Sequence, residues 1–157
     1  MNFSTDILTI FDKGWALVTA GDISDFNTMT ISWGGMGTLW NKPVCTVYVK
    51  PVRYTHEFME NNDYFTVSFF EEGYRKALAL LGSKSGRDGN KVEESRLTPV
   101  RIGENLVGYV QAHRTLVCRK IYSQDLDIAR IPEPERERYY GTEAPHTMYI
   151  GEIVGIG

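Results

Sequence analysis

The sequence has little cysteine and histidine, and it lacks any long hydrophobic run. Cys45 and Cys118 are its only cysteines, they lie far apart, and neither belongs to a CxxC pair. This excludes a disulfide-built scaffold and favours reduced, buried thiols in a cytoplasmic protein. No apolar segment approaches the ~18–20 residues that a membrane-spanning helix needs. Residues 1–6 have neither a positive n-region nor a cleavage-site pattern, so we expect no secretory signal.

An excess of basic residues is also missing. Lys and Arg total 17 against 20 Asp and Glu, so the net charge is −3. Nucleic-acid binding depends on a basic surface, and the composition does not support it. With 157 residues, 42% hydrophobic and 24% charged, we expect a single globular domain over residues 1–157. Aromatic residues reach 12%, which suits a flat ligand or an aromatic interface, although strands also favour them.

Familiar catalytic and metal motifs are absent too. The glycine cluster 35–40 begins like a dinucleotide fingerprint, but Trp40 stands where the third glycine belongs. Residues 82–86 are too short for a Walker loop, and Lys84 occupies the serine position of a hydrolase elbow. The three histidines are isolated, and no pair has metal-ligand spacing. We therefore predict neither a metal site nor a hydrolase.

The segment 27–35 alternates strictly between polar and apolar residues, which is typical of a strand with two different faces. One face carries the hydroxyls of Thr28, Thr30 and Ser32. Glycines at 34, 35 and 37 follow, and they leave a bare backbone that a flat ligand could approach closely. The alternative is an ordinary strand with a solvated face.

The remaining pattern predicts a mostly antiparallel β-barrel with six or seven strands. Besides the strand at 27–35, we expect strands at 15–20, 44–49, 64–70, 97–102, 106–121 and 146–156. Short helices are expected at 4–12, at 55–61 with Thr55 as cap, and at 74–81 with Gly82 as stop. Residues 132–138 are expected to form a surface helix or loop. No βαβ repetition is present, which excludes a doubly wound sheet.

A polar, glycine-rich loop at 82–91 follows the third of these helices. Its donors and positive charges are Ser83, Lys84, Ser85, Arg87 and Lys91. Such a backbone can bind an anion, and Arg53 offers a second phosphate-type donor at a helix start. The alternative is a solvated turn in which Asp88, Glu93 and Glu94 neutralise the loop.

In their order and spacing these segments resemble the flavin reductase-like, FMN-binding split-barrel family, including its flavoredoxin-like branch. The strongest blocks are Asn27–Gly34, Pro51–Thr55, Phe65–Phe69 and Gly82–Asp88, and Cys118–Tyr122 looks like a subgroup marker. The resemblance implies a mainly β (α+β) fold, a six-stranded antiparallel split β-barrel with short flanking helices. It also implies a homodimer with the flavin near the interface.

The resemblance further implies the residues that would bind the cofactor. The phosphate and ribityl hydroxyls of FMN would be bound by Thr30, Ser32, Arg53 and Thr55. The isoalloxazine ring would lie against the backbone near Thr28, Met29, Trp33 and Gly34. The phosphate side would be completed by Ser83, Lys84 and Ser85. Candidates for ring stacking or for the interface, with core packing as the alternative, are Trp33, Trp40 and Tyr54.

The implied chemistry is hydride transfer from NADH or NADPH to the flavin, followed by electron delivery to an acceptor. The cofactor carries this reaction, so we predict no catalytic residue. Two alternatives remain: a non-catalytic electron carrier, and a flavin-free split-barrel binding module. Cys118 is either a redox thiol or a buried structural cysteine. The sequence does not decide between NADH and NADPH, and it does not identify the electron acceptor. It also leaves open whether FMN is tightly bound or exchanged as a substrate.

Overall fold

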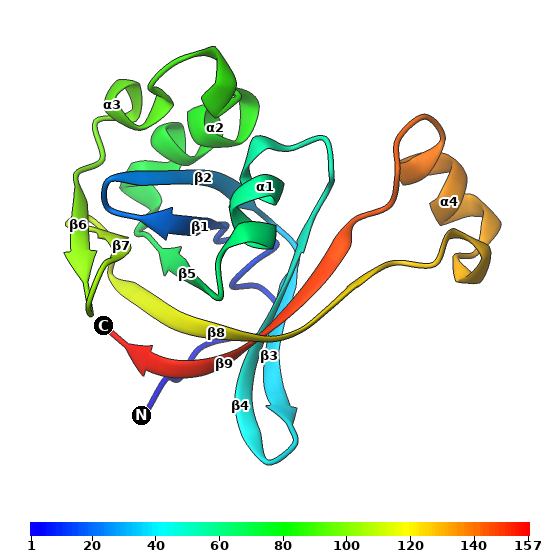
Figure 1. Cartoon of the computed structure of the whole chain (residues 1–157), viewed down its shortest axis with the longest axis horizontal. Helices are drawn as coiled ribbons and strands as arrows, with labels where there is room; N and C mark the ends of the chain where they lie inside the picture. The colour runs from blue at the N-terminus through cyan, green and yellow to red at the C-terminus, as the bar shows by residue number, and fades with distance from the viewer.

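The computed structural model describes residues 1–157, and a seven-stranded antiparallel sheet dominates it (Figure 1). Along this sheet the strands follow the order β2-β1-β5-β8-β9-β4-β3. Their bounds are Ala16–Asp22 (β1), Asp25–Ile31 (β2), Gly34–Leu39 (β3), Lys42–Val49 (β4), Tyr64–Phe69 (β5), Arg114–Asp125 (β8) and Thr147–Ile156 (β9). A separate two-stranded sheet pairs β6 (Pro99–Ile102) with β7 (Leu106–Tyr109).

The two edge strands of the large sheet, β2 and β3, are consecutive in the chain. Only Ser32 and Trp33 separate them. A chain advances at most ~3.6 Å per residue, so this linker cannot span a flat seven-stranded sheet with strands ~4.8 Å apart. The sheet must therefore curl into a barrel (Figure 1). Because β2 and β3 do not pair with each other, the barrel stays split along this seam.

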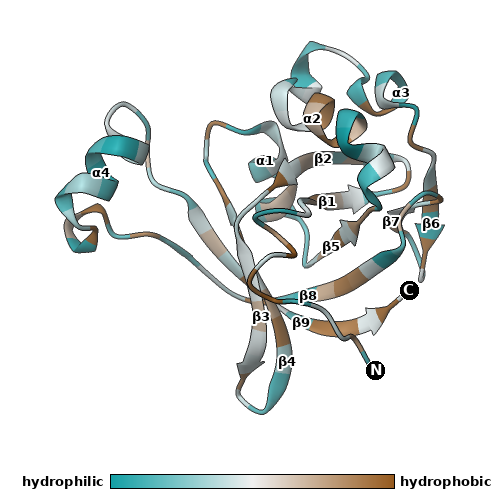
Figure 2. Ribbon diagram, turned by 180° about the vertical axis from the view of Figure 1, so that it is seen from behind, coloured by the Kyte–Doolittle hydropathy of each residue, from teal (hydrophilic) through white to brown (hydrophobic).

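The helices are short and lie outside the barrel. Their bounds are Tyr54–Asn61 (α1), Arg75–Ser83 (α2), Lys91–Ser95 (α3) and Glu133–Tyr140 (α4), with 3₁₀ turns at Glu72–Tyr74, Gly86–Asp88 and Ile128–Arg130. Helices α1 and α2 pack against β2, whereas α4 lies on an arm between β8 and β9 that projects from the barrel (Figure 1). Helix α4 is hydrophilic and buries no residue (Figure 2). No helix is long and apolar enough to cross a membrane.

Strand β1 is buried on both faces and joins two apolar clusters. Val18 faces the barrel interior with Phe65 and Tyr149, while Leu17 packs outside with Leu78 and other residues. Successive strand side chains point to opposite faces, so one strand can serve both clusters. Full burial of each such side chain is worth ~1.5–3 kcal/mol. The outer cluster therefore holds α2 against the barrel.

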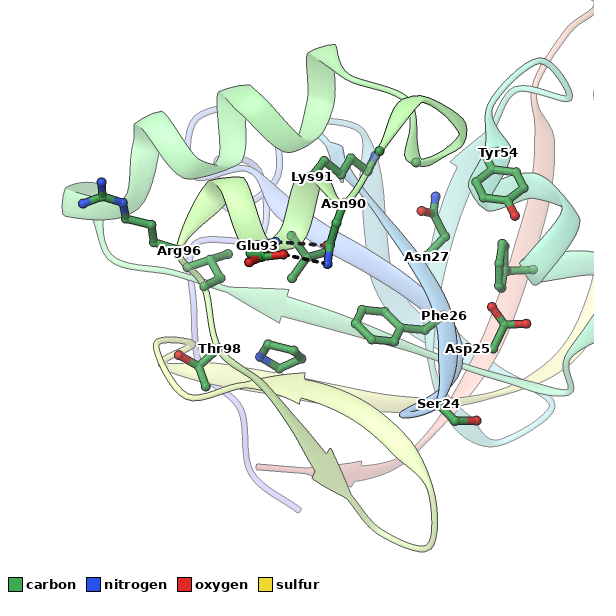
Figure 3. A pocket seen from close by; sticks show the side chains of 16 residues that line it. Ser24, Asp25, Phe26, Asn27, Tyr54, Asn90, Lys91, Glu93, Arg96 and Thr98 are labelled. Atoms are coloured by element: carbon green, nitrogen blue, oxygen red, sulfur yellow. Dashed lines mark hydrogen bonds between the residues drawn. The ribbon is translucent and has the colours of Figure 1, made fainter.

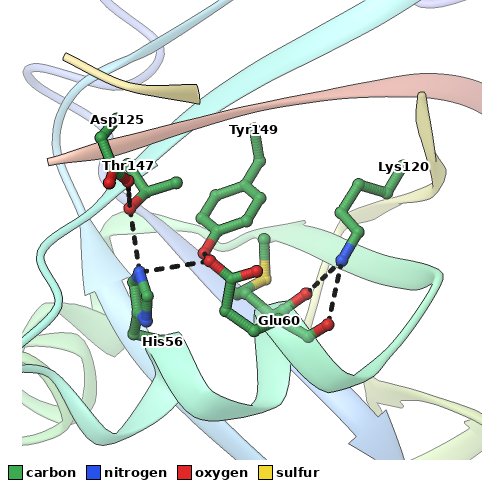
Figure 4. A network of polar contacts seen from close by, with 7 residues as sticks. His56, Glu60, Lys120, Asp125, Thr147 and Tyr149 are labelled. Atoms are coloured by element: carbon green, nitrogen blue, oxygen red, sulfur yellow. Dashed lines mark hydrogen bonds and ion pairs between the residues drawn. The ribbon is translucent and has the colours of Figure 1, made fainter. Parts of the chain in front are cut away.

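A polar network joins α1 to the other side of the barrel (Figure 4). Thr147 of β9 donates its hydroxyl hydrogen to Asp125 Oδ1 at 2.6 Å, so it accepts from His56 Nε2 at 2.9 Å. The Tyr149 hydroxyl donates to Glu60 Oε1 at 3.1 Å. Burial, reinforced by the negative Glu60, raises the pKa of Tyr149 and keeps it a donor. These contacts fix the direction of α1 and hence the position of the residues at its start.

The predicted mostly antiparallel β architecture is confirmed, but two predicted segments differ. The expected strand 106–121 is two strands, because a turn after Tyr109 separates β7 from β8. The expected helix 4–12 is a series of turns over residues 7–14. Only isolated helical bonds form there, such as Ile10 N–H to the Asp6 carbonyl at 3.0 Å, and Leu8 is 85% exposed. Phe11 is buried in the barrel core and Ile10 packs against that core, but a segment this short does not sustain a regular helix.

The helix limits near the predicted site also differ. Gly82 does not stop α2, which continues to Ser83. Its role is packing, since a Cβ at this position would lie 3.1 Å from Thr30 Cβ. Thr55 is not the cap of α1 either, because Arg53 holds that position and Thr55 is buried in the first turn. The expected continuous strand 27–35 is broken at Ser32–Trp33, where the chain crosses the seam.

Candidate functional site

Edge strand β2, the start of α1 and the end of α2 bring three of the predicted segments together. The Thr30 hydroxyl donates to the Leu78 carbonyl of α2. Arg53 Nη2 donates to the Gly82 carbonyl at 2.9 Å, and Gly82 itself packs on Thr30. Residues separated by some fifty positions in the sequence thus share one surface beside the seam.

Arg53 and Lys91 are two partly buried cations with no acidic partner. Lys91 is only 4% exposed, and its Nζ donates to the carbonyls of Leu81 at 3.1 Å and Lys84 at 3.0 Å. Neither cation forms an ion pair. Burial, with the nearby positive charge of Arg53, lowers the pKa of Lys91 to about 8.

Burial also lowers the pKa of Arg53, and the acid that acts against this shift is Glu143. That carboxylate is already paired with Lys50 Nζ at 2.9 Å. The carbonyls at the end of α2 carry only about half a unit of negative charge from the helix dipole. Two cations in one partly buried place are therefore not balanced by the protein. Donors also remain, because a guanidinium has five N–H groups and an ammonium has three. This arrangement suits a divalent anion such as a phosphate group.

The other cations of the 82–91 loop are neutralised. Lys84 Nζ pairs with Glu94 Oε2 at 2.5 Å, and Arg87 Nη2 pairs with Glu57 Oε1 at 2.7 Å. The alternative of a neutralised loop thus holds for these two residues but not for Lys91. Sequence reasoning noted Lys91 among the loop donors and omitted it from the site, because nothing local distinguishes it from Lys84.

The serines of this loop are partly engaged by the backbone. Ser83 Oγ donates to the Leu80 carbonyl at 3.2 Å, and Ser85 Oγ accepts from the Arg87 N–H at 3.2 Å. Both still line a pocket of about 270 Å³ together with Lys84 and Lys91. The predicted loop donors and the buried ammonium thus open onto the same space.

The expected row of three exposed hydroxyls is shorter in the structure. Thr28 is fully buried, and its hydroxyl hydrogen-bonds Thr19 Oγ1 at 2.8 Å. Thr55 is buried too, and its Oγ1 accepts from Asn27 Nδ2 at 2.7 Å. Only Thr30 and Ser32 remain half-buried. Helices α1 and α2 cover this edge of β2, which the period-two pattern could not reveal.

Aromatic side chains surround the other end of the surface. A pocket of about 150 Å³ is lined by residues from three segments: Met29, Thr30, Ile31, Ser32, Trp33, Tyr48 and His146. The Trp33 ring, 43% exposed, meets Tyr139 edge-on with centroids 5.2 Å apart and lies 5.5 Å from the His146 ring. Burial, aided by the charge of Lys50, lowers the pKa of His146 to about 4, so this wall is uncharged at neutral pH. Tyr48 and His146 were not predicted, because they come from distant segments.

The remaining candidates lie elsewhere or in the interior. Trp40 is exposed at the tip of the β3–β4 hairpin, far along the strand from the seam. Gly34 packs against the Phe11 ring, where an added Cβ would lie 2.9 Å from it. Cys45 and Cys118 are free and buried. A hydrogen bond to Cys45, with burial, raises the pKa of Cys118, so the thiol stays protonated and its structural role is favoured.

The fold and this surface define a split β-barrel with a candidate anion site beside its seam. The chain matches the model of the flavin reductase like domain over residues 8–157, and it belongs to that family. The family and the split-barrel fold that the sequence predicts are thus confirmed. No curated protein sequence gives a significant match.

Solved structures of the same fold come from several organisms. A flavoredoxin from Methanosarcina acetivorans is 22% identical, with a TM-score of 0.71 over 100% of this chain and 74% of that one. An FMN-binding protein from Thermus thermophilus, bound to 1-cyclohex-2-enone, is 17% identical, with a TM-score of 0.71 over 100% and 78%. The styrene monooxygenase flavin reductase from Pseudomonas putida S12 is 19% identical, with a TM-score of 0.67 over 92% and 78%. At these identities the likeness shows the shared fold.

Proposed function

We propose that the chain is an FMN-binding oxidoreductase whose flavin phosphate is held by Arg53 and Lys91. The observation that carries this proposal is the pair of partly buried cations with no carboxylate partner. A flavin-free binding module has no use for that pair, because unbalanced charge in a partly buried place is unfavourable. Ser83, Lys84 and Ser85, which line the adjoining pocket, complete the phosphate side.

The rest of the surface suits the remainder of a flavin. Thr30 and Ser32 are the half-buried hydroxyls that line the aromatic pocket, and we assign them to the ribityl chain. The backbone from Met29 to Gly34, with Thr28 buried beneath it, borders the ring. Thr55 is buried and orients Asn27 through its hydrogen bond, while Tyr54 lines the neighbouring cleft that Lys91 also borders (Figure 3).

The protein positions the ring and keeps water from one side of it. When bound, the flavin supplies the redox chemistry, taking a hydride from NADH or NADPH and passing electrons to an acceptor. Trp33, Tyr48 and His146 form an uncharged aromatic wall at that end of the site. Neutral His146 places no positive charge there, and its Nδ1 is already hydrogen-bonded to the Tyr140 hydroxyl at 2.7 Å. We assign no side chain as acid or base.

We also propose a homodimer that covers this end of the site. Trp33 is exposed beside the seam, and the arm that carries Tyr139 projects from the barrel and contacts it (Figure 1). An exposed aromatic at the border of a ligand pocket is typical of an interface. Sedimentation of the purified chain measures this assembly directly.

The test of function is a visible spectrum of the purified protein loaded with FMN, followed by anaerobic addition of NADH or NADPH. Flavin bands that bleach on addition of nicotinamide support the reductase. Bands that persist until dithionite is added support an electron carrier instead. A protein that takes up no FMN refutes both and leaves the binding module.

A further inference from the structure

The arm between β8 and β9 projects from the barrel, and none of its residues is buried (Figure 1). It runs from Leu126 to His146, and the Leu126 N–H donates to the His146 carbonyl at 3.0 Å, which closes its base. Helix α4 within the arm has only eight residues and no apolar face. An isolated helix of this length is not stable in water. The order of the arm therefore depends on the contacts that anchor it to the barrel.

One side chain of the barrel provides all the hydrogen bonds that anchor the arm beyond its base. Every hydrogen bond between residues 127–145 and the barrel comes from Lys50, which directly follows β4. Its Nζ donates to the Tyr139 carbonyl at 3.1 Å, pairs with Glu143 Oε2 at 2.9 Å and lies 5.5 Å from the centroid of the Tyr140 ring. The Lys50 side chain is only 23% exposed, so salt screens this pair less than an open surface pair.

The anchored part of the arm also supports Trp33, which forms one wall of the aromatic pocket. Tyr139, whose carbonyl accepts from Lys50, meets the Trp33 ring edge-on with centroids 5.2 Å apart. Trp33 lies in the two-residue linker between β2 and β3, and the barrel leaves much of its ring uncovered. An edge-to-face contact favours one placement of the ring. Lys50 does not line the pocket itself, and it acts on this wall through Tyr139.

We propose that Lys50 is a positioning residue of the flavin site, which holds the arm against Trp33 so that the bound flavin is retained. The inference rests on the proposed function, because it requires the flavin ring to lie against Trp33. Coupling between two sites is reciprocal. An arm that strengthens flavin binding is therefore itself stabilised in place by the bound flavin. Removal of the Lys50 contacts should release the flavin faster and should also uncouple the arm from flavin binding.

The experiment compares Lys50→Met with Lys50→Arg, which keeps the positive charge and the donors. Lys50→Met should release FMN about tenfold faster than the wild type, on the scale of one hydrogen bond from a charged group, and Lys50→Arg should stay within about threefold. The release rate is measured as the recovery of flavin fluorescence after rapid dilution. Lys42→Met is the matched control, because Lys42 lies at the other end of β4 and pairs with Glu152 at 3.3 Å.

Trypsin reports on the arm directly, because Arg136 and Arg138 lie in α4. Bound FMN should slow cleavage after these residues at least about threefold in the wild type, and by less than about 1.5-fold in Lys50→Met. Lys42 and Lys50 each precede a proline, where trypsin does not cleave, so neither substitution changes the cleavage sites. Glu143→Gln removes the ion pair but keeps the carbonyl contact, and its rate of FMN release should lie between those of the wild type and Lys50→Met. This variant tests the anchor even if Lys50→Met does not fold.

Each other outcome has a definite meaning. If FMN binds but Lys50→Met and the wild type release it at the same rate, the inference is wrong and the proposed function stands. The inference is also wrong if Lys42→Met accelerates release as much as Lys50→Met does, or if bound FMN leaves cleavage of the arm unchanged. If the wild type binds no FMN, the proposed function is wrong, and the inference with it.

Discussion

Replacing Arg53 by alanine isolates the phosphate contact, because riboflavin is FMN without its phosphate. Arg53 lies half-buried beside Lys91, and the only hydrogen bond of its guanidinium within the protein is to the Gly82 carbonyl at 2.9 Å. A hydrogen bond between charged groups is worth about 1.5–3 kcal/mol. At about 1.4 kcal/mol per tenfold, Arg53→Ala should weaken FMN binding by about 10- to 150-fold. Riboflavin affinity should change by less than about twofold, since no charged contact is lost.

The assay is fluorescence titration of both flavins against the wild type and the variant at one ionic strength. Arg87→Ala is the matched control, because Arg87 belongs to the same charged surface but is already paired with Glu57 at 2.7 Å. Its FMN affinity should stay within about threefold of the wild type, as for other exposed pairs. Thermal melting of both variants tests whether the fold persists. Equal losses for FMN and riboflavin, or equal losses in the two variants, would refute the assignment of Arg53 to phosphate.

Three further predictions concern the neighbouring groups. A bound phosphate raises the pKa of Lys91, which is about 8 in the free protein. FMN affinity should therefore fall as the pH rises above about 8, and Lys91→Met should bind more weakly and lose this pH dependence in the same titration. Gly151→Ala should lower the free energy of unfolding in urea by about 1–3 kcal/mol, because the new Cβ would meet Cys118 Cβ at 2.6 Å. Gly155→Ala is its control, since the nearest atom there is at 3.6 Å, and a similar loss in both would contradict the packing argument. The His146 ring should titrate by NMR near pH 4, so it is neutral in the folded state between that pH and 6.5, where the unfolded chain already binds a proton. The contribution of neutral, buried His146 to the free energy of unfolding is fully present above about pH 6.5 and is lost as the pH falls toward 4. A His146 titration at the ordinary pKa of an imidazole would contradict its buried placement.

Most strand positions were predictable because local patterns reflect them directly, whereas the glycine-rich β3 was not predicted as a strand. The runs around Val18, Val47, Val67 and Tyr149 combine β-branched and aromatic residues, and all four are buried in the barrel. The helix predicted at 4–12 is wrong: Phe11 is buried in the barrel core, but Ile7 and Leu8 are exposed, so the apolar pattern does not correspond to one packed helical face. Propensity and periodicity describe which face of a segment can be buried, but they do not identify the segments against which that face packs.

The order and spacing of its segments were enough to determine the family, the mostly antiparallel barrel and the segments that carry the candidate site. Only the tertiary structure decided which charges in those segments are free. Lys84 and Lys91 stand seven positions apart in one loop, yet Glu94 neutralises the first while the second lies buried beside Arg53. It also decided that Thr28 and Thr55 are enclosed, so that neither hydroxyl is open to solvent. The physical reason is that burial and charge pairing depend on contacts between distant segments, whereas strand and helix patterns are local.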